Sequence, residues 1–164
     1  MHLKQFFPQK VLLRNEEIKM KVSVAMATYN EEEYISKQLD SIITQSLHPH
    51  EIVVSDDCSS DGTVDVLNSY SGKYTDISWK TVTSESNSGY IKNFANAIRN
   101  TSGDIIILSD QDDIWDIDKV KFVVSEFAAH EDMLSLHTDY AIIDQEGKPL
   151  CGQQIRAFDS QRAE

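Results

Sequence analysis

Short apolar segments alternate with amphipathic segments along most of this sequence. The apolar segments lie at residues 22–27, 52–55, 77–82, 105–109 and 133–138, and each has the length and composition of a buried strand. Between them, apolar residues recur every three or four positions, as they do on one face of a helix. Strands that alternate with helices pair in parallel and are covered on both faces. We therefore expect an α/β fold, a three-layer α/β/α sandwich with a mainly parallel sheet.

The amphipathic segments predict four helices, two of which carry specific expectations. Asn30 would cap the first helix, and Glu33 would complete a capping box three residues later. The buried stripe of this helix would be Ile35, Leu39, Ile42 and Ile43. The helix at Tyr90–Arg99 would carry a similar stripe on one face, made of Ile91, Phe94, Ala95 and Ile98. The other two helices follow a turn at 59–62 and span 118–129.

The regular alternation defines one domain over residues 20–145. Residues 1–19 show no clean period and are expected to be an N-terminal extension outside the domain, although a small surface helix over 11–18 would also suit them. Residues 146–164 are expected to be a tail of uncertain order. A chain of 164 residues with 40% hydrophobic side chains can bury one core, but it has no room for a second large domain.

Charge and cysteine content narrow the expected partners. The chain has 15 Lys and Arg residues against 27 Asp and Glu residues, so nucleic acid is not an expected partner, because duplex binding depends on clustered basic side chains. The longest aliphatic run, 105–108, is far shorter than the roughly 20 residues of a membrane span. Cys58 and Cys151 have no metal-binding spacing and follow no signal segment, which indicates reduced thiols in a cytoplasmic protein.

Polar residues follow four of the predicted strands, at the sheet edge where ligands of parallel α/β folds bind. These polar clusters are residues 29–30, 56–57, 87–89 and 110–113. The turn after the first strand has no glycine, and its glutamates at 31–33 would repel a dinucleotide's pyrophosphate. The phosphate-binding motif GxxxxGK[ST] is also absent from the sequence. These observations exclude an NAD-type or P-loop site.

The strongest single motif is SDQDD at residues 109–113, directly after an aliphatic strand. If the strand geometry continues, Asp110 and Asp112 point to one side, with their α-carbons about 6.6 Å apart. Two carboxylates at that spacing can bind one Mg²⁺ or Mn²⁺ ion, which would let an acidic cleft accept phosphates. The alternative is that these aspartates only cap the next segment.

Asp56 and Asp57 have two interpretations on the residues alone. A carboxylate there can accept hydrogen bonds from a nucleobase or a ribose, with Tyr29 stacking on the base. Alternatively, the stretch SDDCSSDG is a turn held by Asx-type hydrogen bonds. The same stretch matches part of a calcium-binding EF-hand loop, but Asn68 stands where a bidentate Glu is needed and a strand precedes it.

Four ordered blocks resemble family 2 glycosyltransferases of the GT-A fold, a Rossmann-like fold of nucleotide-diphospho-sugar transferases. The blocks are VSVAMATYNEEEYISKQLDSIITQS, EIVVSDDCSSDGT, NSGYIKNFANAIRNTSG and DIIILSDQDD, followed by Ile114 and Trp115. The match covers roughly residues 21–138. The form SDQDDIW is similar to bacterial rhamnosyltransferase-like members of the family.

The resemblance implies metal-dependent, inverting transfer of a sugar from a nucleotide-diphosphate-sugar donor to a hydroxyl of a glycan or lipid-linked acceptor. It implies Mn²⁺ or Mg²⁺ as cofactor and a role in bacterial polysaccharide or cell-surface glycan synthesis, in the cytoplasm or at the cytoplasmic face of the membrane. The implied nucleotide-binding residues are Ala27 (through its backbone), Tyr29, Asn30, Asp57, Lys92 and Asp110. In the DxD motif, the implied direct metal ligand is Asp112, with Asp110 and Asp113 as the other candidates.

The general base cannot be assigned to a residue of this sequence. In inverting family members it is an acidic residue well beyond the DxD motif, and only 51 residues follow Asp113. We therefore expect the base to lie beyond the C-terminus and the chain to be the donor-binding half of a truncated enzyme. Two alternatives stay open: a nucleotide-sugar-binding module without transfer activity, and a phosphohydrolase of the haloacid dehalogenase type, for which the later acidic cluster and Lys are missing.

Overall fold

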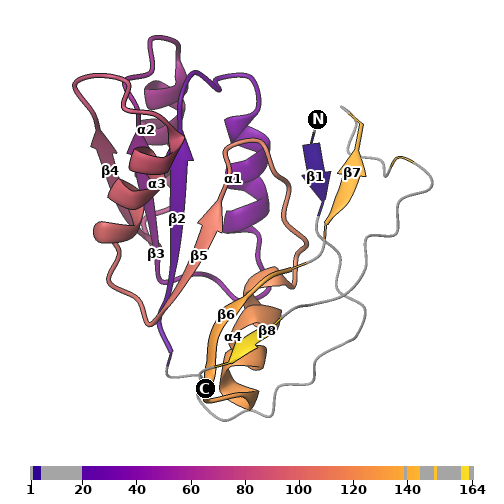
Figure 1. Cartoon of the computed structure of the whole chain (residues 1–164). Coiled ribbons are helices and arrows are strands. Elements are labelled where there is room, and N and C mark those ends of the chain that lie inside the picture. Colours follow the sequence, from indigo (N-terminus) through magenta and orange to yellow (C-terminus); the bar gives the residue numbers. More distant parts are fainter. Residues whose placement is uncertain (1, 5–19, 139, 145–149, 151–159, 163–164) are drawn as a thin grey trace.

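The computed structural model describes residues 2–4, 20–138, 140–144, 150 and 160–162 (Figure 1). Its centre is a four-stranded sheet in the order β4-β3-β2-β5. The strands are β2 (Val22–Thr28), β3 (Glu51–Asp56), β4 (Ser78–Thr83) and β5 (Ile105–Ser109), and every neighbouring pair is parallel. Because the strands are parallel, their carboxyl ends meet at one edge, and the arrowheads of β2, β4 and β5 point the same way in Figure 1. The predicted α/β fold with a mainly parallel sheet is confirmed.

Four helices connect and cover these strands: α1 (Ile35–Ile43), α2 (Thr63–Lys73), α3 (Tyr90–Arg99) and α4 (Lys119–Ala129). On one face of the sheet, Val24 and Met26 of β2 join a buried cluster with the predicted stripe of α1. Leu67 of α2 and Val120 of α4 complete the same cluster. On the other face, α3 packs against β2 and β3. Alternate strand residues therefore serve two helix layers, as expected for a three-layer sandwich.

The apolar stripe predicted for α3 is not the face that this helix buries. Asn93 and Ala97 are the buried residues of this helix, whereas Ile91 is 68% exposed and Ile98 is 36% exposed. The reason lies in the sheet, which presents small residues such as Ala25 to this side. A helix above small side chains approaches closely, and the amides of α3 then bond to the sheet, for example Asn93 Nδ2 to the carbonyl of Thr28 at 3.0 Å. The face of α3 that packs on the sheet therefore follows its amide hydrogen bonds rather than the spacing of its apolar residues.

The predicted capping box at Asn30 is also wrong. Helix α1 begins at Ile35 after Tyr34 and has no side-chain cap, while Asn30 has a left-handed φ of 52° and stays outside the helix. The N–H of Asn30 donates to Ser59 Oγ at 2.9 Å, and its Oδ1 accepts from the N–H of Ser60 at 2.8 Å. The loop after β2 is thus tied to the loop after β3, and this pairing replaces the local cap.

The remaining strands form two separate pairs, visible apart from the main sheet in Figure 1. β6 (Met133–Leu136) pairs antiparallel with β8 (Ser160–Arg162), and β1 (His2–Lys4) pairs antiparallel with β7 (Ala141–Ile143). The strand predicted at 133–138 therefore exists, but it does not extend the parallel sheet. The alternative helix over 11–18 and most of the tail at 146–164 lie outside the described residues. No described helix has the length and apolar character that a membrane crossing requires.

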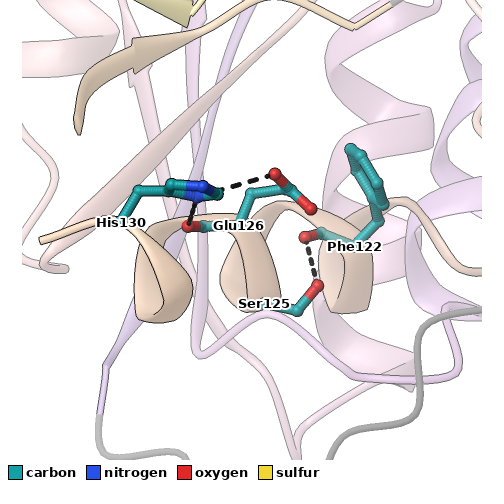
Figure 2. Close-up of polar contacts among 4 residues, drawn as sticks. All are labelled: Phe122, Ser125, Glu126 and His130. Atoms are coloured by element: carbon teal, nitrogen blue, oxygen red, sulfur yellow. Dashed lines mark hydrogen bonds and ion pairs between the residues drawn. The ribbon is translucent and has the colours of Figure 1, made fainter. Parts of the chain in front are cut away.

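The last turn of α4 is closed by local polar contacts (Figure 2). The Nδ1 of His130 lies 3.1 Å from the carbonyl oxygen of Glu126, which can only accept, and 3.8 Å from the Glu126 carboxylate. Ser125 Oγ donates to the carbonyl of Phe122 at 2.7 Å. These side chains add contacts to carbonyl groups of α4, and the carbonyl of Glu126 also accepts from the N–H of His130 at 3.1 Å.

Candidate functional site

A cleft of about 320 Å³ opens at the carboxyl edge of the sheet. Its lining comes from the ends of β2, β3 and β5, from the loop before α3 and from α3 itself. The lining residues are Ala27, Thr28, Tyr29, Glu31, Asp57, Asn87, Gly89, Tyr90, Asn93, Phe94, Asp110 and Gln111. Four of the site residues predicted from the sequence line this cleft: Ala27, Tyr29, Asp57 and Asp110.

The other nominated residues lie around this cleft rather than in its lining. Lys92 is exposed on α3, yet its charge still contributes to lowering the pKa of Asp57. Asn30 borders a second, more open hollow with the acidic residues 31–33 and Asp61. Asp112 and Asp113 follow Asp110 in the segment beyond β5.

The Asp57 carboxylate binds the loop that precedes α3. Its Oδ1 accepts from the N–H and the Oγ–H of Ser88, and its Oδ2 accepts from the N–H groups of Ser88 and Gly89, all within 2.8–3.0 Å. Burial by itself raises the pKa of the Asp57 carboxyl, but these hydrogen bonds and the charge of Lys92 bring it below its ordinary value. Gly89 has a φ of +86°, a conformation that glycine adopts without strain, so the loop can curl around the carboxylate.

Asp56 and Asp57 have different hydrogen-bond partners, and the turn interpretation of SDDCSSDG holds for Asp56. Asp56 is fully buried, and its carboxylate accepts from the N–H of Ser59 at 2.9 Å and from Thr28 Oγ at 3.0 Å. This is the turn-forming role. Asp57 points instead to the cleft and the loop before α3.

Aromatic rings line two sides of the cleft. Tyr29 follows β2, whereas Tyr90 and Phe94 belong to α3. The N–H of Tyr29 donates to Gln111 Oε1 at 2.7 Å, so a side chain within the SDQDD motif fixes the backbone beneath this ring. Sequence reasoning missed Gln111, because the flanking aspartates gave the motif its signal. Flat apolar walls of this kind suit stacking of a planar ring.

The acidic segment 110–113 does not continue the strand. β5 ends at Ser109 and the chain bends beyond it, so the predicted spacing of Asp110 and Asp112 from strand geometry is wrong. The two carboxylates are nevertheless electrostatically linked: burial raises the pKa of Asp110, and the charge of Asp112 raises it further. Among the residues that the structure describes, no group of three or more metal-binding side chains occurs. A carboxylate pair still fits Mg²⁺ or Mn²⁺, because such ions often take one or two protein carboxylates and complete their shell with water and substrate phosphates.

Polar side chains of α1, and Gln45 just beyond its end, hold the segment that follows β5. Gln38 Nε2 donates to Ser109 Oγ at 2.6 Å, and Ser41 Oγ accepts from the N–H of Trp115 at 3.1 Å. Gln45 Nε2 donates to the carbonyl of Asp116 at 2.6 Å, while its Oε1 accepts from the N–H of Val120 at 2.9 Å. Both glutamines are buried. These residues were not foreseen, although polar side chains at spacings of three and four beside an apolar stripe could have indicated them.

Lys119 is a second unforeseen feature of this region. It is almost fully buried, and its Nζ lies 3.9 Å from the centre of the Trp115 ring. Burial lowers the pKa of Lys119 to about 7, and the negative charge of Asp113 opposes that shift. A cation packed on an aromatic face in this way fixes Trp115 beside the acidic segment.

These features define an α/β protein of the GT-A type, with an acidic and aromatic cleft at the carboxyl edge of its sheet. The chain belongs to glycosyl transferase family 2, whose sequence model matches residues 23–159. The predicted family resemblance is therefore confirmed.

Individual relatives give the same result. The chain is 35% identical over 130 residues to the putative teichuronic acid biosynthesis glycosyltransferase TuaG of Bacillus subtilis, covering 79% of this chain and 50% of TuaG. It is 39% identical over 99 residues to the dTDP-rhamnosyl transferase RfbG of Shigella flexneri, covering 58% of this chain and 34% of RfbG. The second match confirms the predicted similarity to rhamnosyltransferases.

A solved structure supports the fold and includes a bound ligand. The mannosyltransferase PcManGT of Pyrobaculum calidifontis, in complex with GDP-Man and Mn²⁺, aligns with a TM-score of 0.62 and 29% identity. The alignment covers 66% of this chain and 32% of PcManGT. The chain thus spans half or less of the length of each of these three relatives.

Proposed function

We propose that this chain binds the nucleotide-sugar donor of a glycosyltransferase and serves sugar transfer to an acceptor hydroxyl. The proposed pathway class is bacterial polysaccharide or cell-surface glycan synthesis, with a glycan or lipid-linked acceptor, at or near the cytoplasmic face of a membrane. Support comes from family membership and from the names of TuaG and RfbG. The cleft at the carboxyl edge is the proposed donor site.

The nucleotide is proposed to lie between Tyr29 and α3. The ring of Tyr29 would stack on the base, and the backbone of Ala27 would form the floor beneath it. Asp57 would act by holding Ser88 and Gly89 in place, because its two oxygens already accept the bonds from that loop. Lys92, which is exposed close enough to affect the pKa of Asp57, would attract the diphosphate.

The divalent ion is proposed to bind at Asp112 and Asp110, with Asp113 as the third candidate. Two linked carboxylates repel each other, and an ion between them removes that repulsion. When bound, Mn²⁺ or Mg²⁺ would act as a Lewis acid that stabilises charge on the leaving diphosphate. Gln38 of α1 and Gln45 just after this helix would keep the aspartates in position through the bonds described above.

Transfer is proposed to occur with inversion, by direct attack of the acceptor hydroxyl on the anomeric carbon. The observation that carries the whole proposal is the position of Asp110 in the lining of an aromatic cleft, with Asp112 close enough to raise its pKa. A net charge of −12 makes such a cleft repulsive to a diphosphate unless a cation lies between the two.

Thermal unfolding of the whole chain with UDP, dTDP or GDP tests this proposal. With Mn²⁺ present, a ligand at 100 times its Kd should stabilise the chain by about 2.7 kcal/mol. The gain should vanish in a chelator and in Asp112→Asn. Asp132→Asn, an exposed aspartate that does not line the cleft, is the matched control and should keep the gain. Equal stabilisation with and without metal would contradict the metal-dependent site.

A separate assay distinguishes transfer from donor binding alone. The chain is incubated with a labelled nucleotide sugar and bacterial cell-wall glycan, and labelled polymer is counted. Incorporation would establish the enzyme, whereas donor binding without incorporation would favour the binding module.

A further inference from the structure

Gln111 joins two parts of the proposed donor site, the acidic segment after β5 and the loop after β2. Both Gln111 and Tyr29 line the cleft, and Gln111 Oε1 accepts from the N–H of Tyr29 at 2.7 Å. In the sequence, Gln111 lies between Asp110 and Asp112, the two residues proposed to bind the ion. Anything that fixes these two carboxylates therefore also acts on the residue that bonds to Tyr29.

This hydrogen bond replaces a strand partner that β2 lacks at its end. The pairing of β2 with β5 stops at Met26 and Ser109, although β2 itself continues for two more residues. The carbonyl of Lys21 accepts from a backbone N–H of β5, and alternate residues of a parallel strand bond to the same neighbour. Tyr29 is an even number of residues from Lys21, so its N–H points to the β5 side. The side chain of Gln111 supplies the acceptor there.

The acidic segment is held at both ends and bends between them. Before it, Ser109 Oγ accepts from an α1 side chain at 2.6 Å, and after it, the N–H of Trp115 donates to another α1 side chain at 3.1 Å. Carboxylates that bind one ion lie at a short, fixed distance from it. An ion held by the residues on either side of Gln111 therefore restricts Gln111, and Gln111 in turn restricts the backbone of Tyr29.

We propose that Gln111 is a positioning residue that couples binding of the ion to binding of the nucleoside. The ion strengthens the contact between Tyr29 and the base through the protein, in addition to any bridge that it makes to the diphosphate. Because such coupling is reciprocal, the nucleoside tightens binding of the ion by the same factor. This inference rests on the proposed function and deepens it, since it states how the two halves of the donor site depend on each other.

A nucleoside without phosphates separates this coupling from a bridge between metal and phosphate. Uridine, thymidine and guanosine are uncharged at pH 7 and offer the ion no phosphate, so an effect of Mg²⁺ on their binding must pass through the protein. Each is titrated into the whole ¹⁵N-labelled chain, with and without a large excess of Mg²⁺, and its Kd is taken from amide NMR shifts. At least one of the three should bind about fivefold more tightly with Mg²⁺.

Gln111→Met tests the residue itself, because Met has a similar length but no oxygen to accept from the N–H of Tyr29. Mg²⁺ should still bind this variant, but the nucleoside affinities with and without it should agree within about twofold. Asn87→Leu is the matched control. Asn87 also lines the cleft, but its Oδ1 accepts from the N–H of Gly89 at 3.1 Å within its own loop, so the Mg²⁺ dependence should persist.

The amide signal of Tyr29 gives a second readout that needs no nucleoside. A large excess of Mg²⁺, enough to occupy a weak site, should shift this signal in the native chain together with the signals of residues 109–113. In Gln111→Met the signals of the acidic segment should still move, and the shift at Tyr29 should be much smaller. A purely structural role of Gln111 would not produce this dependence on Mg²⁺.

The outcomes distinguish this inference from the proposed function. Nucleoside affinities that ignore Mg²⁺ in the native chain, or an Mg²⁺ dependence that persists in Gln111→Met, would overturn the role of Gln111. The donor site would stand in both cases if UDP, dTDP or GDP still binds with Mn²⁺. If no nucleoside binds measurably, the Tyr29 signal decides, and equal shifts in the two chains would overturn the inference. Failure of all three nucleotides to bind with Mn²⁺ would overturn the proposed function and this inference with it.

Discussion

Replacing Asp57 with Asn should destabilise the chain, because the carboxylate holds the beginning of α3. The new amide keeps one acceptor, but its NH₂ group would face the N–H of Gly89, which now donates to Asp57 Oδ2 at 2.8 Å. A hydrogen bond to a charged group contributes about 1.5–3 kcal/mol. Gly89 retains one weaker bond to Asn87 Oδ1 at 3.1 Å, which offsets part of the loss. We expect Asp57→Asn to lower the free energy of unfolding by about 2 kcal/mol.

The effect should depend on pH in a direction set by the lowered pKa of Asp57. A carboxyl whose folded pKa lies below its unfolded value, about 3.9 for Asp, stabilises the fold above that value. The stabilisation is lost as the pH falls through the folded pKa. The difference between the native chain and Asp57→Asn should therefore be full at pH 7 and shrink below about pH 4.

Urea unfolding, followed by circular dichroism at pH 7 and pH 3, measures both expectations. The midpoint should fall at pH 7 with an unchanged slope, which indicates a change in stability alone. Asp65→Asn, an exposed aspartate on α2, is the control and should change little. A loss below about 0.5 kcal/mol, or the same loss at both pH values, would refute this account of Asp57.

Three further changes test the rest of the structure. Gln45→Ala should lower stability by about 1–3 kcal/mol in urea, since it leaves the buried N–H of Val120 unpaired and removes one of the two hydrogen bonds to the carbonyl of Asp116; a near-zero change would show that water replaces the glutamine. Lys119→Met should have a larger free energy of unfolding than the native chain at pH 7, because Lys119 has a folded pKa of about 7 and is destabilising while the unfolded chain keeps it charged. The difference should narrow as the pH rises towards 10, where the unfolded Lys also becomes neutral. A difference that widens with pH would contradict this. Ile91→Ser should change the free energy of unfolding by less than about 0.5 kcal/mol, because Ile91 is exposed. Leu39→Ala in the core should lower it by about 2–5 kcal/mol. Similar losses in both variants would show that Ile91 is packed.

The strands and the main core were readable from sequence because apolar content determines them directly. The segment 22–27 was expected as a strand and β2 is Val22–Thr28, and the stripe of α1 is buried as its spacing indicated. Helix α3 could not be read in this way, because its packing depends on how small the facing sheet residues are. That information lies in β2 and β3, far from α3 in the chain.

The sequence predicted which loops form the site, but not how their side chains are arranged. The rule that ligands bind at the carboxyl ends of parallel strands correctly grouped Tyr29, Asp57 and Asp110. It could not show that the Asp57 carboxylate accepts hydrogen bonds from the loop before α3. Most of those bonds come from backbone N–H groups, which every sequence supplies equally. Asn93 was hidden for the same reason, because its partner is a main-chain carbonyl.

Amide NMR spectra of the labelled chain with Mn²⁺ and UDP locate the ion directly, because the paramagnetic metal broadens nearby signals. Broadening centred on 109–113, spreading to Tyr29 and Gly89 and appearing only with both ligands, is the expected pattern. Broadening centred instead on the second acidic hollow, at residues 31–33 and Asp61, would mean that the ion does not join the donor to the Asp110–Asp112 pair.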